Sequence, residues 1–365
     1  MKIAIVTPIF NIAGVPLAQH RFARALAQRN HEVEFIIGFL PSSLYPPDVP
    51  GLKINILKNN RVFKMFFKLF FIFKKNKFDI IFSAEDHLNV VVILANFLSG
   101  SKAKISASSR VTPLDTYSDT WFSKRWFLKQ LTKLTMKRAN VLSCVSKDMV
   151  LQYQSMFKNS THQAIYNIVD DKFSRAKMLE KVDHRWFDEN HKKLIIASGR
   201  LATWKGFEDL IRAMPFVLKK ENVRLIILGD GPLKESLQNL IQDLDLNSHV
   251  ELLGYVNNPL KYYKKADVFV LSSHVEGLPN VLVEAMMCGC TPVSTDCPTG
   301  PREVLEGGKY GYLVPMKNPK SLAQGIIQAL KTPISEDLLN EAVLPFEENK
   351  VLEAHTKALR LTTPL

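Results

Sequence analysis

The sequence predicts an α/β fold of two doubly wound, Rossmann-like domains, each a parallel sheet with helices on both faces. Short apolar runs rich in β-branched residues alternate with segments of helical periodicity, which is typical of βαβ units. A chain of 365 residues is also long for a single hydrophobic core. The alternation stops after residue 166 and restarts near residue 191, which indicates two domains joined by a linker.

The elements follow in order along the chain. The first domain, residues 1–166, has predicted strands at residues 3–7, 33–37, 54–57, 80–83, 104–107 and 141–145. Residues 167–190 have mixed charge, few β-branched side chains and no clear period, so they form the predicted linker. The second domain, residues 191–345, has predicted strands at residues 194–198, 223–228, 250–253, 268–271, 291–294 and 312–314. Ligands of such sheets bind beyond the carboxyl ends of the strands, so we expect the chemistry in the cleft between the domains.

The composition is ordinary for a soluble globular protein, with 46% hydrophobic and 23% charged residues. The apolar run at the amino terminus is too short for a signal peptide, so the expected location is the cytoplasm. The cysteines lack the paired spacing of a zinc site, and we expect free thiols and no metal ion. These cysteines are Cys144, Cys288, Cys290 and Cys297.

The formal net charge of +13 is unevenly distributed. Residues 1–165 contain 23 Lys and Arg against 9 Asp and Glu, whereas the remainder contains 25 against 26. Such asymmetry indicates that the first half meets an anionic surface or polymer, either a membrane or a nucleic acid.

Two basic and aromatic clusters in the first half bear on that choice. In the first cluster, the bases fall on one predicted helical face and the phenylalanines on the opposite side. This pattern suits a helix at a membrane interface, and it equally suits an ordinary helix whose phenylalanines form core. Because the aromatic side chains do not share a face with the bases, we expect an anionic membrane and no nucleic acid as partner. The first cluster is Arg61, Lys64, Lys68 and Lys75 with Phe63, Phe66, Phe67, Phe70 and Phe73; the second is Trp121, Phe122, Lys124, Arg125, Trp126, Phe127 and Lys129.

A turn at residues 274–280 joins the predicted strand 268–271 to a segment of helical periodicity. Proline suits the first position of a helix, so the helix is predicted to start near Pro279. The backbone N–H groups of Leu278, Asn280 and Val281, at the positive end of the helix dipole, would face a diphosphate. Gly277 lets the backbone approach such an anion closely.

Two glutamates bracket this predicted anion site. Glu284 lies five residues beyond Pro279, about 7 Å along the helix, where a ribose diol could reach it. Glu276 precedes the helix and points from the same turn toward whatever the phosphates carry on their other side. Together with the turn, these residues are interpreted as a site for a sugar nucleotide.

The stretch from residue 272 to residue 315 resembles family 4 of the retaining glycosyltransferases. The family signature is a glutamate, seven residues and a second glutamate, which Glu276 and Glu284 match. Residues 288–296 match the small-residue turn and strand that continue the signature, and residues 300–304 and 311–315 match the next block. The resemblance implies the GT-B fold, in which a last helix, here within residues 346–365, crosses back to the first domain.

Further donor-site residues are carried over from the resemblance. Gly199, Arg200 and Lys205 follow the first strand of the second domain, and fixed cations there would stabilise the charge that a leaving diphosphate gains. The resemblance also implies contacts to the base or phosphates from residues at other strand ends. These residues are Gly14, Gly229, Tyr255 and Val256. The chain departs from the family at Ala13, where a first glycine is usual.

The first domain offers candidate acceptor contacts at its strand ends. Glu85 and His87 follow the predicted strand 80–83. Arg110 follows the strand 104–107, where the family often has a polar or imidazole residue near the transferred sugar.

The function expected from the sequence is metal-independent, retaining transfer of a hexosyl or N-acetylhexosaminyl unit from a nucleoside diphosphate sugar, with UDP as the expected nucleotide. Glu276, Arg200 and Lys205 are the expected catalytic residues. The expected acceptor is a lipid-linked or cell-surface glycan, used in polysaccharide, lipopolysaccharide or glycolipid biosynthesis by a protein peripheral to the inner face of the cytoplasmic membrane. Two alternatives stay open: a sugar-nucleotide epimerase of the same fold, or an inactive sugar-nucleotide-binding protein.

Overall fold

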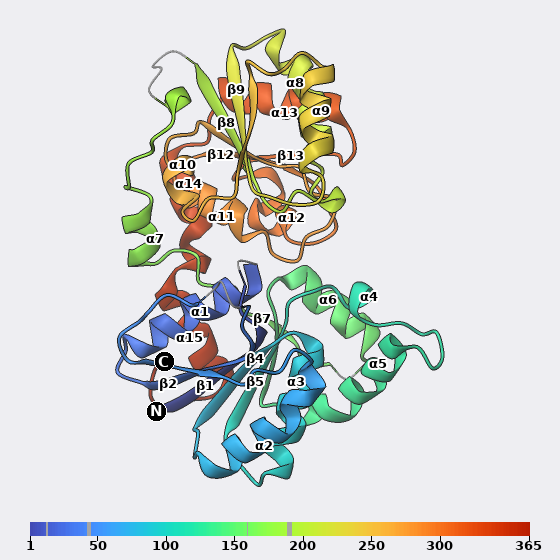
Figure 1. The fold of residues 1–365 in the computed structure, drawn as a ribbon, viewed down its shortest axis with the longest axis vertical. Helices are drawn as coiled ribbons and strands as arrows, with labels where there is room; N and C mark the ends of the chain where they lie inside the picture. Colours follow the sequence, from blue (N-terminus) through green and yellow to red (C-terminus); the bar gives the residue numbers. More distant parts are fainter. Residues whose placement is uncertain (12–13, 42–44, 159, 188–191) are drawn as a thin grey trace. The chain divides into compact units, whose positions relative to one another are not determined.

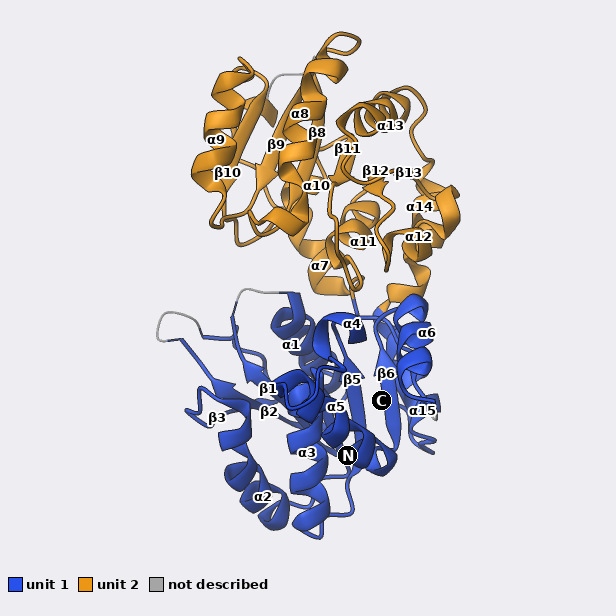
Figure 2. Ribbon diagram, turned by 90° about the vertical axis from the view of Figure 1, so that its right-hand side faces the viewer, with its two compact units in different colours: residues 1–168, 348–365 blue, residues 169–347 orange. Residues whose placement is uncertain are grey.

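A computed structural model describes all of residues 1–365 except 12–13, 42–44, 159 and 188–191. Two compact units are present (Figure 2). Unit 1 comprises Met1–Ile168 and Glu348–Leu365, and unit 2 comprises Val169–Glu347. Ala13 and the predicted boundary at residues 190 and 191 lie outside the described residues.

Unit 1 contains a seven-stranded, all-parallel sheet in the order β3-β2-β1-β4-β5-β6-β7. All six predicted strands are present, so this half of the fold prediction is confirmed. The seventh strand was not predicted, because two residues with one polar side chain leave no hydrophobic pattern to detect. The strands are β1 Lys2–Ile9, β2 Glu32–Phe39, β3 Leu52–Ile56, β4 Ile80–Ala84, β5 Lys104–Ser109, β6 Val141–Cys144 and β7 Gln163–Ala164.

Helices cover both faces of this sheet (Figure 1). Ile3 and Ile5 of β1 face the core shared with α1 and α15, whereas Ala4 and Val6 face the core shared with α2 and α3. This alternation follows from the two-residue period of a strand. The helices are α1 Gly14–Ala27, η1 Val62–Lys64, α2 Met65–Lys75, α3 Asp86–Leu98, α4 Pro113–Thr116, α5 Lys124–Thr135, η2 Met136–Arg138, α6 Lys147–Met156 and α15 Glu348–Ala358.

Unit 2 contains a six-stranded, all-parallel sheet in the order β10-β9-β8-β11-β12-β13. Every predicted strand is present, and the predicted α/β fold of two doubly wound sheets is therefore confirmed. The strands are β8 Lys193–Ser198, β9 Val223–Leu228, β10 Val250–Gly254, β11 Val268–Leu271, β12 Thr291–Thr295 and β13 Tyr312–Val314.

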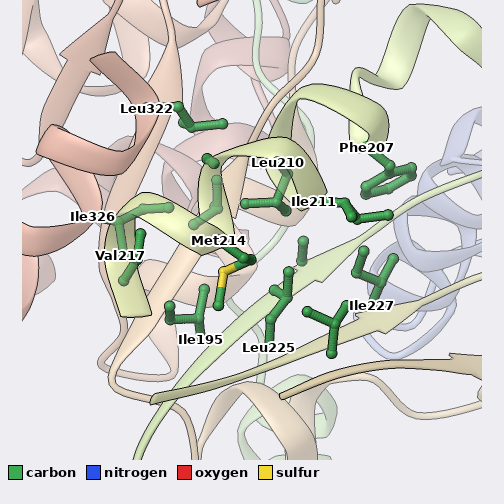
Figure 3. Packing of buried hydrophobic residues seen from close by; sticks show 14 of the residues in the cluster. Ile195, Phe207, Leu210, Ile211, Met214, Val217, Leu225, Ile227, Leu322 and Ile326 are labelled. Atoms are coloured by element: carbon green, nitrogen blue, oxygen red, sulfur yellow. The ribbon is translucent and has the colours of Figure 1, made fainter. Parts of the chain in front are cut away.

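A hydrophobic core of unit 2 lies between this sheet and α8, α9 and α13. Leu210, Met214 and Val217 of α8 belong to the same buried cluster as Ile195 of β8 and Leu225 of β9 (Figure 3). The helices of this unit are α7 Lys172–Lys177, η3 Arg185–Phe187, η4 Thr203–Lys205, α8 Phe207–Leu218, α9 Lys234–Asp243, α10 Leu260–Tyr263, α11 Asn280–Met287, α12 Pro301–Val304, η5 Glu306–Gly308, α13 Pro319–Lys331, α14 Glu336–Val343 and η6 Leu344–Phe346.

The segment interpreted as a linker contains regular structure. Asp171 caps α7 by accepting hydrogen bonds from the backbone of Phe173 and Ser174. Asp170 accepts two hydrogen bonds from the Arg175 guanidinium. The short helix is thus held by local polar contacts, which is why no hydrophobic period marks it in the sequence.

Candidate functional site

The turn between β11 and α11 lies at the carboxyl edge of the unit 2 sheet, as predicted. Pro279 is the residue before the helix, and the helix itself begins at Asn280. The Asn280 N–H donates to the Leu278 carbonyl at 3.0 Å, so the prediction that this amide is open to an anion is wrong. This N–H group already has a partner within the tight turn that precedes the helix.

Lys205 and Glu276 form an ion pair across two strand-end loops. The Lys205 Nζ lies 2.6 Å from the Glu276 Oε1, and the two side chains are only 19% and 10% exposed. Lys205 ends the 3-10 helix that follows β8, and Glu276 stands in the turn that follows β11. Because β8 and β11 are hydrogen-bonded neighbours in a parallel sheet, both loops emerge at the same edge.

Main-chain contacts hold these two loops together. The Ser272 Oγ donates to the Lys205 carbonyl at 2.8 Å, and the His274 N–H donates to the Trp204 carbonyl at 2.8 Å. Gly206 has φ +62°, and a Cβ there would stand 2.0 Å from the Ser272 carbonyl oxygen. Only glycine fits this point, where the two backbones touch.

A third loop supports the turn from the side of β12. The Thr299 Oγ1 donates to the Glu276 carbonyl. Gly300 has φ +91°, and a Cβ there would lie 2.6 Å from the Pro279 Cδ and 2.7 Å from the Gly277 carbonyl oxygen. The block at residues 300–304 that resembles the family is therefore the packing partner of the turn that carries Glu276.

The predicted glycines at the other strand ends also mark close backbone contacts. Gly229 has φ +144°, and its Cβ would stand 1.9 Å from the Gly199 carbonyl oxygen. The Gly229 N–H donates to the Gly254 carbonyl at 2.8 Å. The close approach of the Gly199 and Gly229 backbones thus accounts for the glycine at position 229.

The remaining donor-side residues line the same edge with different exposure. Arg200 is exposed, directly after Gly199. Tyr255 is 47% exposed, and burial of part of its ring raises the pKa of the phenol. Val256 is half-buried beside it. An exposed cation and an exposed aromatic ring are suited to contact a ligand at this edge.

Glu284 is half-buried in α11, one turn beyond Asn280. After burial, the charge of Glu284 is the largest cause that raises the pKa of Tyr263. The Tyr263 hydroxyl also bonds to the Ser198 Oγ at the end of β8. Tyr263 is thus in contact with the strand that leads to Arg200.

Two polar residues at this edge were not predicted. The His274 Nε2 lies 2.7 Å from the Asp209 Oδ2 of α8. His274 stands inside the predicted turn, and Asp209 follows Lys205 by four residues, so their positions could have drawn attention to them. Nothing in the sequence indicates that they meet.

The acceptor candidates Glu85 and His87 lie in unit 1, where β4 leads into α3. Glu85 has φ +81°, an uncommon backbone conformation for a residue with a side chain. Burial raises the pKa of its carboxyl to about 7, against an opposing effect of Arg110. The His87 Nε2 lies 3.3 Å from the Glu85 Oε2, and burial lowers the pKa of His87.

Asp86, between them, was not predicted as a polar centre. It is buried, and it accepts hydrogen bonds from the Ser109 Oγ at 2.5 Å and from the Tyr153 hydroxyl. Burial is the main cause that raises the pKa of this carboxyl. Glu85 and Asp86 are neighbours in the sequence, and nothing in the sequence indicated that Asp86 is buried while Glu85 is partly exposed.

Arg110 contacts the interior of unit 1. It donates to the Asn167 side chain, and burial lowers the pKa of its guanidinium to about 10. It lines a cavity of about 30 Å³ with Gln19, Ser106 and His355, and each of these four side chains has one buried atom without a hydrogen-bond partner among the described residues. Such a cavity suits ordered water. Gly14 is exposed at the start of α1.

The helix with the first basic cluster buries one side only. Met65, Leu69 and Phe73 are buried against α3, which confirms that part of the helix is core. Phe63 and Phe67 are 60% and 69% exposed, so they do not belong to this core. The phenylalanines of this segment are spread around the helix. Only those on the side that faces α3 can be buried.

The second cluster lies around α5, which neighbours α3 on the same face of the sheet (Figure 1). Trp121 and Phe122 are 74% and 75% exposed. Lys129 is buried and pairs with Asp119 at 2.6 Å, so it does not belong to the basic surface. Ser123 caps the helix by accepting from the Trp126 backbone.

In the part of the chain that the structure describes, no three His, Cys, Asp or Glu side chains gather as a metal site. The four cysteines are buried and unpaired, and burial raises the pKa of the Cys288 and Cys297 thiols to about 12. Among the described helices, none combines the length and apolar character that crossing a bilayer requires.

Two family models match most of the chain between them. Residues 12–173 match the model described as glycosyltransferase family 4, and residues 180–343 match the model described as glycosyl transferases group 1. The second match contains the whole unit 2 edge from Gly199 to Gly300.

Similar curated proteins include two enzymes of Campylobacter jejuni. One, whose name gives N-acetylgalactosaminyl transfer to a diphospho-undecaprenol-linked disaccharide, is 33% identical over 256 residues, 70% of this chain and 66% of that protein. Another, an α-1,4-N-acetylgalactosaminyltransferase also named for a diphospho-undecaprenol-linked substrate, is 26% identical and covers 94% of this chain and 92% of its own length. An uncharacterized glycosyltransferase of Methanocaldococcus jannaschii is 35% identical over 67% of this chain and 62% of its own length. The chain thus covers less than two thirds of the first and third of these relatives.

Among solved structures, Anabaena HepE in complex with UDP superposes with a TM-score of 0.77 at 18% identity, over 99% of this chain and 100% of that one. Sucrose-phosphate synthase of Thermosynechococcus elongatus gives the same TM-score of 0.77 at 17% identity, over 98% of both chains. These likenesses concern the fold.

Proposed function

Because the chain belongs to glycosyltransferase family 4 and has the GT-B fold, we propose that it transfers a hexosyl or N-acetylhexosaminyl unit from a UDP-sugar to a lipid-linked glycan, with retention of configuration. One observation carries the proposal: the Lys205–Glu276 ion pair, at the edge of the unit 2 sheet, beside the start of α11. Lys205 can bind a phosphate and Glu276 can accept hydrogen bonds from sugar hydroxyls. Because the two side chains are in contact at this edge, they can meet the two parts of one sugar nucleotide.

The proposed roles follow from the places of the side chains. Arg200 and Lys205 neutralise the charge that develops on the leaving diphosphate, which stabilises the transition state more than the ground state. Glu276 accepts hydrogen bonds from hydroxyls of the transferred sugar. Glu284, one turn into α11, holds the ribose.

The proposed reaction is a front-face displacement. The bond between the anomeric carbon and the diphosphate oxygen breaks, and the acceptor oxygen bonds to the same face of the sugar. The leaving phosphate oxygen takes the proton of the acceptor hydroxyl. In retaining glycosidases one of two close carboxylates is the nucleophile, but Glu284 is assigned here to the ribose and is unavailable for that role.

The choice of donor and acceptor is supported by the relatives. HepE binds UDP in its crystal structure. The two Campylobacter enzymes are named for N-acetylgalactosamine transfer to glycans on diphospho-undecaprenol. We infer the same nucleotide and the same class of acceptor for this chain, and binding of different nucleotide sugars identifies the sugar.

A lipid-linked acceptor requires the protein to reach a membrane, and we propose that the α2 and α5 side of unit 1 binds the anionic inner face. Exposed Phe63, Phe67 and Phe71 repeat every four residues along η1 and α2, among exposed lysines. Each basic residue near an anionic leaflet contributes about 1 kcal/mol, and exposed aromatic rings suit the interfacial layer. The proposed protein is thus peripheral to the cytoplasmic membrane.

The test begins with thermal denaturation in the presence of UDP, GDP and their common sugars. UDP and one or more UDP-sugars are expected to raise the melting temperature, and the sugar that does so is then used in labelled form with a membrane lipid extract. Label that moves into a lipid fraction supports the transferase. Conversion of the donor to an epimer without any acceptor would favour the epimerase instead, and stabilisation without turnover would favour the inactive binding protein.

A further inference from the structure

We propose that Asp209 and His274 are positioning residues that hold Glu276 against Lys205 so that both can meet the donor. The inference rests on the proposed function, because it concerns the same edge of the unit 2 sheet. It adds a role to two residues that the family signature of two glutamates does not include.

The contact joins the two loops that carry the pair. The His274 Nε2 and the Asp209 Oδ2 are 2.7 Å apart, and the side chains are 22% and 20% exposed. His274 precedes Glu276 by two residues, and Asp209 follows Lys205 by four. The ion pair of interest and the proposed positioning contact therefore connect the same two segments.

Asp209 offers a fixed anchor. The neighbouring Leu210 and Ile211 are fully buried in the core under α8, so the first turn of this helix cannot shift freely. The turn that carries His274 has no regular structure between Leu271 and Asn280. Of the two partners, the helix is therefore the rigid one, and the turn is the one that is positioned.

The rest of the interface fixes the direction of His274. Its backbone N–H donates to the Trp204 carbonyl at 2.8 Å, and a Cβ at Gly206 would stand 3.0 Å from the His274 Nε2. The imidazole is thus packed over the glycine that precedes α8, with its Nε2 toward Asp209. Main-chain bonds set the separation of the loops, and the imidazole–carboxylate contact sets how the turn lies on the helix.

A positioning role can be separated from a role in stability. The same two loops are also joined by the bonds of Ser272 to Lys205 and of His274 to Trp204, so breaking this one contact should leave the protein folded. The effect should instead be local, in the mobility of the turn and in the affinity for a nucleotide whose phosphates meet the main chain of the turn before α11.

The experiment compares three variants of the full chain with the wild type. Asp209→Ala and His274→Asn remove the contact, whereas His274→Gln keeps a side-chain amide that can reach the place of Nε2 and donate to Asp209. Glu208→Gln is the matched control, because Glu208 is the exposed neighbour on α8 and pairs with Arg212. UDP is the probe for calorimetry, and amide hydrogen exchange without ligand reports on residues 272–281.

In Asp209→Ala and His274→Asn, we expect exchange at residues 272–281 to rise about tenfold while β8 and α8 keep their protection. We expect the Kd for UDP to rise about tenfold. His274→Gln should stay within about threefold of the wild type in both measurements, and Glu208→Gln should match it.

Unchanged exchange in Asp209→Ala would overturn the inference, and so would a uniform loss of protection across unit 2, which would mean that the contact only stabilises the fold. Failure of His274→Gln to restore the wild-type values would also count against it. If the wild type binds no UDP, the proposed donor is wrong, and the exchange measurement alone then decides whether the contact positions the turn.

Discussion

Unit 1 contains 26 Lys and Arg against 11 Asp and Glu, whereas unit 2 contains 22 against 24. The bases of unit 1 lie among exposed aromatic side chains such as Phe67 and Trp121. In unit 2 the charged groups at the sheet edge meet partners, as in Lys205–Glu276 and Asp209–His274. Unit 1 thus carries an excess of basic residues, whereas acids and bases are nearly balanced in unit 2.

The acids at the two sheet edges differ in their surroundings. Glu85 and Asp86 of unit 1 are acids whose pKa is raised, chiefly by burial. In unit 2, Glu276 has a lysine as its immediate partner. The same α/β plan thus surrounds its edge carboxyl groups differently: Glu276 stands against a lysine, whereas Asp86 accepts hydrogen bonds from two hydroxyl groups.

The largest effect is expected from Glu276→Gln. Loss of the carboxylate should lower turnover by about 10²–10³-fold, because the proposed contact to the sugar matters most in the transition state, while the Kd for UDP changes by less than about threefold. Labelled transfer and calorimetry measure the two quantities. Equal losses in turnover and UDP affinity would contradict the separate roles of Glu276 and Lys205.

The contrast between buried and paired acids predicts a pH effect for Glu85→Gln. Since the pKa of Glu85 is raised from 4.5 to about 7, the folded state holds its proton longer than the unfolded state, so the stability that the protonated carboxyl provides is lost as pH rises through this range. The loss is at most about 3 kcal/mol. The free energy of unfolding of Glu85→Gln minus that of the wild type should therefore be larger at pH 8 than at pH 4.5. Chemical denaturation at the two pH values measures this difference.

A suitable control for this measurement is Glu208→Gln in unit 2, an exposed acid paired with Arg212, which should show no comparable change between the two pH values. Parallel curves for Glu85→Gln and the wild type would remove the proposed contrast between the acids of the two units.

A smaller effect is expected from Glu284→Ala. Loss of hydrogen bonds between the carboxylate and the ribose should raise the Kd for UDP about 10- to 100-fold, which corresponds to the strength of bonds to a charged group. Turnover at saturating donor should fall much less. An unchanged Kd in calorimetry would show that Glu284 does not hold the nucleotide.

The smallest effect is expected from Phe67→Ser, which tests the surface of unit 1. Phe67 is 69% exposed, so its removal should not disturb the core, but it should weaken binding to anionic phospholipid vesicles about fivefold. Phe216→Ser in unit 2 is the matched control, because Phe216 is a partly exposed phenylalanine flanked by Lys219 and Lys320. Cosedimentation at low and high salt would show the difference, and equal losses in the two variants would contradict it.

Much of the fold could be predicted from the sequence because the strands of a doubly wound sheet are buried on both faces. Runs such as residues 223–228 therefore contain hardly any polar side chains, and their ends are visible. The exception, β7, is two residues long and has no such run. The helix α7 escaped for a related reason, since its cap at Asp171 is polar and local.

The candidate site could be predicted in part. The turn before α11, with Glu276 and Glu284, follows from local sequence, because its glycine, proline and acids lie within nine residues. The hydrogen bond from the Asn280 backbone N–H to the Leu278 carbonyl could not be predicted, because it depends on the geometry of the turn. The inward position of Lys129 likewise depends on Asp119, ten residues earlier, with which it pairs.

By itself, the sequence determined the order of the strands and helices, the excess of positive charge in the first half and the two-glutamate motif, because each is a property of neighbouring residues. The tertiary structure alone decided that Asp209 meets His274, that Phe73 is buried while Phe67 is exposed, and that Arg110 lines an internal cavity. Each of these depends on a partner brought from far along the chain. Local periodicity records which faces are apolar, and only packing decides what covers them.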